Sequence, residues 1–231
     1  MSNFQYVIKR NKRLLGNINL RVKDGQVVVS APFWVSTKVI DNFVVSKTDW
    51  IAKALTKQSK TVFKNYTEGE THLLYGQDIP LIINKVDSLT RTTVNFENQS
   101  LSLKIYQGFQ GESYQKEAEK AFLSFYLQEL SYYLTDKVNF YTKALGVEYS
   151  KIEIKKVSSI WGSCSPQNVL SFNRKLIQSP KEIIDYVVIH EVCHLKERNH
   201  SSRFWALVGK FDKDFQKHRR WLHQNGVKLR L

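Results

Sequence analysis

The N-terminal part of the chain alternates apolar and polar positions with a period of two. Between residues 4 and 31, Ile18, Leu20 and Val22 are separated by polar residues, and Asp24-Gly25 follows them. Asp-Gly between alternating hydrophobic runs is a strong signal for a two-residue hairpin turn. The stretch therefore predicts antiparallel strands joined by a hairpin turn, and Pro32 ends the second of these strands.

The period then changes twice. Ser36 and Ser46 each precede apolar residues at helical spacing, which predicts one or two short helices with serine N-caps. From residue 71 to 106 the alternation of strands returns. The polar segment 107–112, with two glycines, is the expected boundary of a mainly antiparallel β domain with short helices, spanning residues 1–110.

A long helix is predicted next. From residue 113 onward, apolar residues recur at steps of three and four and form one continuous stripe: Leu123, Leu127, Leu130, Leu134, Val138, Tyr141 and Leu145. Gly146 is a natural stop, because glycine adopts the left-handed conformation that ends many helices. Strands are expected over residues 149–157 and 168–177, with a loop between them.

The most apolar helical pattern begins at Ser179 and runs to Arg198. Ser179 is a suitable N-cap, Pro180 occupies the first helical position, and Glu182 comes three residues after the cap. This arrangement is a capping box. The residues that follow are apolar most of the way round, which indicates a buried helix.

Two further helices are expected after that one, with Ser201 and Asp212 as N-caps and a stop at Asn225-Gly226. Residues 113–231 thus form a second predicted domain of a long helix, a short sheet, a buried helix and C-terminal helices. Together with the β-rich first domain, this predicts an α+β fold.

The buried helix carries a metal-binding pattern, His190-Glu191-x-x-His194. Residues four apart lie on one face of a helix, so both imidazoles can bind one ion. Zinc favours such nitrogen ligands, and a catalytic site keeps three protein ligands and one water. Glu191 lies about 100° round the helix from His190 and can accept a proton from that water. The pattern predicts a metal-dependent hydrolase.

The third ligand is less directly specified. His200 follows His194 by six residues, the spacing of proteases with the pattern HExxHxxGxxH. The glycine that turns the chain in those proteases is replaced by Glu197, so Asn199 is the expected left-handed pivot. Glu197 itself, His218 and His223 are the alternatives; the two last histidines are expected on a solvated helix face.

Composition limits the class of protein. The chain of 231 residues carries a net charge of +14, spread over both halves, which permits an anionic partner such as nucleic acid. No apolar run approaches 18 residues and the start lacks an apolar signal region, so a cytoplasmic protein without membrane association is expected. Two cysteines, Cys164 and Cys193, make no disulfide framework.

Three segments together resemble the YgjP-like metallopeptidases, predicted zinc proteases related to the SprT-like group. They are Trp161-Gly162-Ser163-Cys164-Ser165, then Asp185-Tyr186-Val187-Val188 leading into the HExxH pattern, and Asn199-His200-Ser201 with Phe204-Trp205. The likeness also extends to the N-terminal strands and Trp50, so it covers most of the chain.

The resemblance implies a small zincin scaffold, with residues 114–145 as a backing helix behind the active-site helix. It implies one Zn²⁺ ion held by His190, His194 and His200, with Glu191 as the catalytic base. An edge strand, expected at Val169–Leu176, would bind extended substrate. The expected substrate-binding residues are Trp161, Gly162, Ser163, Cys164, Phe172 and Asn173.

One position departs from the family pattern. The family usually has arginine before its WGSC segment, where this chain has Ile160; Lys155, Lys156 and Arg174 are nearby cations that could replace it. The function expected from the sequence is that of a zinc endopeptidase acting on protein or peptide. The alternatives are a basic protein that binds or acts at nucleic acid, and a chain whose metal site is structural or inactive.

Overall fold

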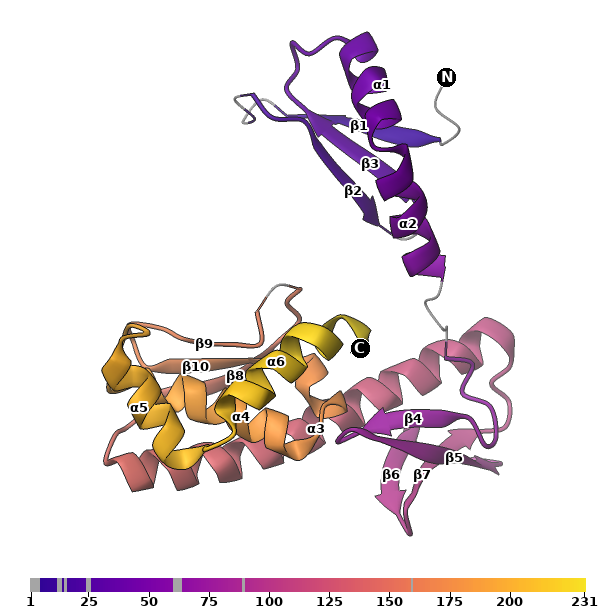
Figure 1. Cartoon of the computed structure of the whole chain (residues 1–231). Helices are drawn as coiled ribbons and strands as arrows, with labels where there is room; N and C mark the ends of the chain where they lie inside the picture. Colours follow the sequence, from indigo (N-terminus) through magenta and orange to yellow (C-terminus); the bar gives the residue numbers. More distant parts are fainter. Residues whose placement is uncertain are drawn as a thin grey trace. The chain divides into compact units, whose positions relative to one another are not determined.

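The computed structural model describes residues 5–11, 14, 16–23, 26–59, 64–88, 90–158 and 160–231. The chain divides into two compact units, Met1–Lys64 and Asn65–Leu231. Both combine helices with small separate sheets, which confirms the predicted α+β class (Figure 1). No helix in the described ranges has the length and apolar character needed to cross a membrane.

In the first unit, the sheet has the order β1-β3-β2. Its strands are β1 (Tyr6–Arg10), β2 (Asn19–Lys23) and β3 (Gln26–Ala31). The predicted antiparallel hairpin is formed by β2 and β3, although Asp24 and Gly25 themselves lie outside the described residues. Strand β1 runs parallel to β3, with Tyr6 opposite Val27, so the expectation of an all-antiparallel sheet is wrong here. The hairpin turn sets only the direction of β2 relative to β3, and β1 pairs with the opposite edge of β3, where no local turn sets its direction.

Two helices, α1 (Thr37–Ser46) and α2 (Thr48–Ser59), run along one face of this sheet (Figure 1). Ser36 caps α1 as predicted, because its side chain accepts a hydrogen bond from the Val39 N–H. Ser46 does not cap α2: it is the last residue of α1, and its hydroxyl donates to the Phe43 carbonyl. The buried core of this unit consists of Val27, Val29, Ala31, Ile40, Val44 and Ile51.

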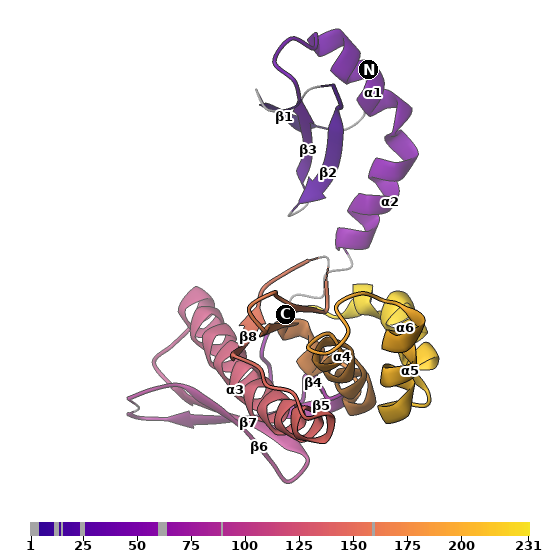
Figure 2. The ribbon, with the colours of Figure 1, turned by 90° about the vertical axis from the view of Figure 1, so that its left-hand side faces the viewer.

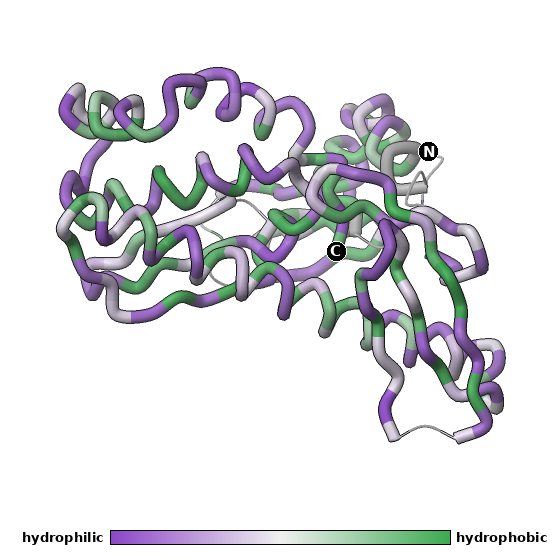
Figure 3. Tube along the Cα trace, turned by 90° about the horizontal axis from the view of Figure 1, so that it is seen from below, coloured by the Kyte–Doolittle hydropathy of each residue, from purple (hydrophilic) through white to green (hydrophobic). Residues whose placement is uncertain are grey.

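The second unit begins with a four-stranded sheet of order β4-β5-β7-β6. The strands are β4 (Thr71–Leu74), β5 (Gln77–Val86), β6 (Thr93–Glu97) and β7 (Ser100–Tyr106). Buried and exposed positions alternate along β5 and β7, and hydropathy alternates along the strands in Figure 3. The strands occur where the sequence predicts them. Tyr75-Gly76 joins β4 to β5 and Asn98-Gln99 joins β6 to β7, each as a two-residue turn with positive φ.

Helix α3 (Gly111–Leu145) follows, and Gly146 ends it in the left-handed conformation as predicted (φ 63°). The predicted domain boundary at residues 107–112 does not separate the units. Phe122 and Leu130 of α3 share one hydrophobic core with Leu103 of β7 and Val188 of the next helix. The four-stranded sheet has no independent core, so it belongs with the C-terminal part of the chain and the division falls after Lys64.

The second sheet of this unit has the order β8-β10-β9, from β8 (Lys151–Lys155), β9 (Gly162–Cys164) and β10 (Val169–Asn173). Strand β9 lies in the segment that was expected to be a loop. The strand predicted to continue to residue 177 ends at Asn173, where a 3₁₀ helix, η1 (Arg174–Gln178), begins. The Asn173 side chain accepts a hydrogen bond from the Lys175 N–H and thereby starts that helix.

Helix α4 (Lys181–Cys193) lies between α3 on one side and α5 and α6 on the other (Figure 2). The predicted capping box is wrong, because the Ser179 hydroxyl donates to the Leu176 carbonyl and closes η1 instead. The helix also ends at Cys193 rather than continuing to Arg198. Its apolar character is confirmed by nine buried residues around its circumference.

Helices α5 (Ser202–Phe211) and α6 (Phe215–Asn225) complete the unit. Ser201 caps α5 as predicted and accepts a hydrogen bond from the Phe204 N–H. Asp212 does not cap α6, which begins after Asp214. Its carboxylate instead accepts hydrogen bonds from the Asp214 N–H and from the His218 ring.

Substitutions at two glycines of the second unit are expected to destabilise the fold for different reasons. Gly76 (φ 79°) would place a Cβ 2.7 Å from Pro180, whereas a Cβ at Gly146 (φ 63°) meets nothing within 4 Å. Gly146→Ala is expected to lower the free energy of unfolding by about 1 kcal/mol, from backbone strain alone. Gly76→Ala is expected to lower it by more, because the packing of α4 on the hairpin is also disturbed. Urea denaturation of both variants measures the difference; equal losses would contradict a steric role for Gly76.

Candidate metal centre

Three histidines converge at the end of α4. His190 lies in the last turn of that helix, His194 is its C-cap, and His200 precedes the N-cap of α5. Their possible ligand atoms all lie within 4.8 Å of one another, and the Nε2 atoms of His190 and His200 are 3.0 Å apart. The donor set and its spacing fit one zinc ion with a free coordination position.

The chain reaches His200 by a turn that differs from the predicted one. Immediately after Cys193, the N–H groups of Lys196 and Glu197 bond to the Cys193 carbonyl, so the helix closes early. Asn199 is not in the left-handed region, and its side chain accepts a hydrogen bond from the Ser201 N–H. The chain leaves α4 through a turn at residues 194–196, without a glycine, and bends again at Asn199. The left-handed conformation expected for Asn199 is wrong.

Ring protonation suits metal binding. His194 Nδ1 lies 3.0 Å from the Glu197 carbonyl, which holds the proton on that nitrogen and leaves Nε2 free. Glu197 therefore contributes its backbone, and its carboxylate is outside the cluster. Burial, followed by the neighbouring His194 and His200, lowers the pKa of His190 to about 3. Burial also lowers the pKa of His194. Both rings are neutral at pH 7, the form that binds metal.

Two aromatic residues of α5 hold the imidazoles in place. The ring of Phe204 is fully buried and stacks on His194 with centroids 4.4 Å apart. Trp205 stacks on His200 at 5.6 Å, with the ring planes 22° apart. These supports were not recognised as such from sequence, although the Phe-Trp pair was part of the family resemblance. A helical pattern shows which residues face inward but not which ring they touch.

Glu191 is the buried acid of the site. Its side chain is only 5% exposed, and burial raises the pKa of its carboxyl to about 8. A Cβ at Gly162 would lie 2.6 Å from both Cγ and Oε1 of Glu191. The backbone of β9 therefore packs directly on the glutamate, and only glycine leaves room for it.

A cleft of about 350 Å³ opens beside these residues. It is lined by His190, Glu191, Ile160, Trp161, Gly162, Tyr186, Val187, Arg219, Leu222 and His223. The structure thus brings two of the predicted substrate-binding residues, Trp161 and Gly162, together with the proposed base. Arg219 and Tyr186 had not been assigned to the site. No local spacing links Arg219 of α6 to the HExxH pattern, whereas Tyr186 lies one turn before His190 on α4 and its helical spacing could have indicated it.

The other expected substrate-binding residues lie elsewhere. Phe172 is fully buried in the core, and the Asn173 amide donates to the carbonyls of Val157 and Ile160, so it holds that loop. Cys164 contacts the Arg198 guanidinium, 3.4 Å from its sulfur. Ser163 belongs to β9 but does not line the cleft. Phe172 and Asn173 support the site from behind.

The expected edge strand also changes. Strand β10 is the centre of its sheet, paired with β8 and β9, so the Val169–Leu176 segment has no free edge. Strand β9 is the outer strand beside α4. The edge strand next to α4 is therefore β9, which carries part of the WGSC segment.

Two of the three candidate replacements for the family arginine, Lys155 and Arg174, are engaged elsewhere. Lys155 pairs with Glu153, and the Arg174 guanidinium donates to the Leu231 carbonyl. Of the alternative ligands, His218 bonds to Asp212 at 2.8 Å with a side chain 14% exposed, so it is not on a solvated face as expected. His223 lines the cleft outside the histidine cluster.

Comparison with known proteins places the chain in a family. No curated protein matches it. The solved structures that match include two metallopeptidase zymogens, each over 39% of this chain with a TM-score of 0.36. They are abylysin of Pyrococcus abyssi (22% identity, 93% of that chain) and jannalysin of Methanocaldococcus jannaschii (23% identity, 88% of that chain). The model of the YgjP-like metallopeptidase domain matches residues 16–225. Because this match spans nearly all of the chain, the protein belongs to the YgjP-like metallopeptidase family.

Proposed function

We propose that this metallopeptidase is a zinc-dependent endopeptidase in which Glu191 is the general base. The observation that carries the proposal is a cluster of three imidazoles, one of which, His190, lines the same cleft as the buried carboxyl of Glu191. Neutral nitrogen donors favour zinc over the hard cations that prefer oxygen.

His190, His194 and His200 would hold the ion. Bound zinc supplies a water of lowered pKa and polarises the carbonyl of the scissile peptide bond. Glu191 takes the proton from the nucleophilic water and delivers it to the leaving amine. The raised pKa suits the second step, in which the carboxyl holds the proton before it passes to the amine. The first step needs the ionised carboxylate, which the positive charge of a bound ion would favour.

The geometry of β9 supports binding of an internal peptide segment. The Trp161 carbonyl accepts from the Asn173 N–H, and the Ser165 N–H donates to the Val169 carbonyl. Backbone groups alternate in direction along a strand, so those of Gly162 and Cys164 point away from β10. An extended peptide can pair with that free edge and pass the metal without presenting a chain end, which favours endopeptidase action.

Replacing Glu191 tests the base. Glu191→Gln is expected to keep one bound zinc and to lower kcat for peptide hydrolysis by about 100-fold or more, since a glutamine cannot accept the proton. Zinc content by atomic spectroscopy and cleavage of an unfolded protein substrate provide the measurements. His190→Ala serves as the contrast, with both zinc and activity lost. A Glu191→Gln enzyme with full activity would refute the assignment.

In the absence of metal and at high pH, the Glu191→Gln variant should be more stable than the wild-type protein. The pKa of Glu191 is about 8 in the folded chain against 4.5 for an ordinary glutamate, so folding disfavours its ionised form. Wild-type stability relative to Glu191→Gln should therefore fall as pH rises from 4.5 to 8, by up to about 1.4 kcal/mol per unit. Denaturant unfolding of both zinc-free proteins across this range measures it. A pH-independent difference would contradict the burial effect.

Gly162 should matter through Glu191 rather than through metal binding. Gly162→Ala places a methyl group 2.6 Å from the carboxylate and should displace it, lowering kcat by about 10- to 100-fold with zinc retained. Gly209→Ala in α5 is the matched control, because its Cβ would meet only Phe215 at an ordinary 3.5 Å. Equal activity of the two variants would show that β9 does not position the base.

A further inference from the structure

The metal centre leaves one charged residue at the cleft unexplained. Arg219 of α6 lines the cleft that holds Glu191 and His190, yet neither metal binding nor proton transfer requires it. We propose that Arg219 determines specificity by binding a carboxylate of the peptide substrate. The inference rests on the proposed function, since it names the substrate class of the same site.

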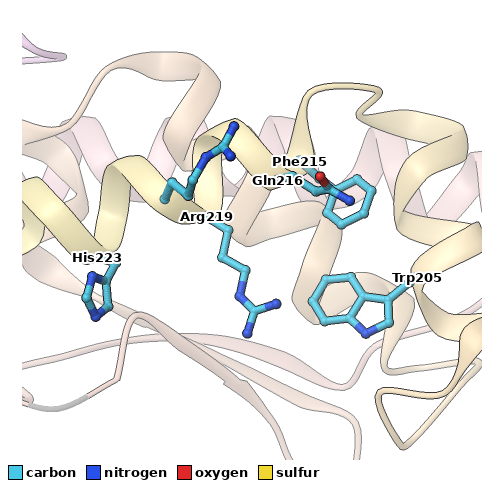
Figure 4. A pocket seen from close by; sticks show the side chains of 6 residues that line it. Trp205, Phe215, Gln216, Arg219 and His223 are labelled. Atoms are coloured by element: carbon cyan, nitrogen blue, oxygen red, sulfur yellow. The ribbon is translucent and has the colours of Figure 1, made fainter.

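Arg219 stands where two cavities meet. Besides the cleft, it lines an adjoining cavity of about 530 Å³, formed by Trp205, Phe215, Gln216, Arg219, Arg220 and His223. Figure 4 shows the Arg219 side chain extending from α6 between Trp205 and His223. His223 also lines both cavities. A substrate residue next to the scissile bond can therefore extend from the cleft towards this guanidinium.

The guanidinium is held but not neutralised. Its Cζ lies 5.2 Å from the centroid of the Trp205 ring. In the described part of the chain, no carboxylate forms an ion pair with Arg219 and no acceptor forms a hydrogen bond with it. By contrast, Lys137 and Lys155 lie beside carboxylates, and Arg174 and Arg198 bond to carbonyls. A cation fixed over a ring, with its N–H groups free, is arranged for an incoming anion.

The tryptophan platform is itself fixed beside the metal centre. Trp205 stacks on Phe215, with the ring planes 17° apart, and it also stacks on His200, one of the three proposed metal ligands. Contacts therefore run from His200 through Trp205 to Arg219. An anion bound at Arg219 would in this way be coupled to the position of a proposed metal ligand. The contact of Arg219 Cζ with the Trp205 ring uses none of the guanidinium N–H groups as donors to a protein acceptor, so they are available for two parallel hydrogen bonds to a carboxylate.

A peptide carboxylate suits the surroundings better than a nucleic-acid backbone. The cleft walls beside Arg219 include the apolar Ile160 and Leu222, and the same cleft contains the buried acid Glu191. A backbone with regularly spaced phosphates needs a track of cations, whereas this cleft offers one guanidinium and the adjoining cavity adds only that of Arg220. A peptide that is otherwise apolar and carries one acidic group matches a cleft with apolar walls and a guanidinium.

The carboxylate has two possible sources, a Glu or Asp side chain or the C-terminal end of the peptide. Both are tested with zinc-loaded Glu191→Gln, which holds substrate without turnover. Fluorescent peptides are made in pairs that differ by Glu or Gln at one position, and in pairs with a free or an amidated C-terminus. Fluorescence anisotropy gives the Kd of each.

We expect the carboxylate peptide of one pair to bind about tenfold more tightly than its neutral partner, the size of a charge-assisted contact at an exposed site. Adding Arg219→Gln should reduce that ratio to about one, and Arg219→Lys should give an intermediate ratio. Lys217→Gln is the matched control: it removes one positive charge from an exposed position of α6 that lines neither cavity, and should keep the preference.

Three results would overturn the proposal. In the first, the preference for the carboxylate peptide survives Arg219→Gln. In the second, Arg219→Gln weakens the binding of both peptides of every pair equally, as a loss of packing would. A single-stranded oligonucleotide could instead displace all peptides, with a steep salt dependence that Arg219→Gln removes, which would assign the residue to nucleic acid. Failure of the proposed function is separate, because it appears as wild-type protein that binds these peptides without cleaving them.

Discussion

Burial of α4 on all sides is the constraint on which the site depends. The helix presents apolar residues to α3, to η1 and to the C-terminal helices, and Ile184 and Val188 are fully buried. A polar contact fixes its rotation, because the Tyr133 hydroxyl of α3 donates to Asp185 at 2.8 Å. A helix packed in this way cannot turn about its axis without exposing apolar surface. The direction in which His190 and Glu191 point is therefore set by the core.

The same packing creates the unusual state of Glu191. A carboxylate in an apolar setting disfavours its charge, and this cost is tolerated because the fold gains far more from the apolar residues around it. Gly162 is the counterpart on β9: without a side chain, it lets the strand approach the glutamate closely. At this one contact, the strand proposed to hold a substrate also confines the glutamate proposed as the base.

The histidine cluster depends on a second layer of aromatic rings. His194 is fixed on one side by the Glu197 carbonyl and on the other by Phe204, while Trp205 stacks on His200. Trp205 also contacts Arg219, so the metal ligands and the proposed anion site share one support. Helix α5, which follows the turn that carries His200, therefore supports both the histidine cluster and the proposed anion site.

The sequence by itself determined the elements with strong local signals. The long α3 with its glycine stop, the apolar α4 and the three candidate ligands could all be predicted, because helical period, Gly146 and the HExxH spacing are properties of neighbouring residues. What depends on distant contacts was missed or misplaced. Examples are the parallel pairing of β1, the edge position of β9, the unit boundary after Lys64 and the arrival of Arg219 at the cleft. Strand order and helix packing are decided by which apolar faces can be buried together, and no local pattern contains that information.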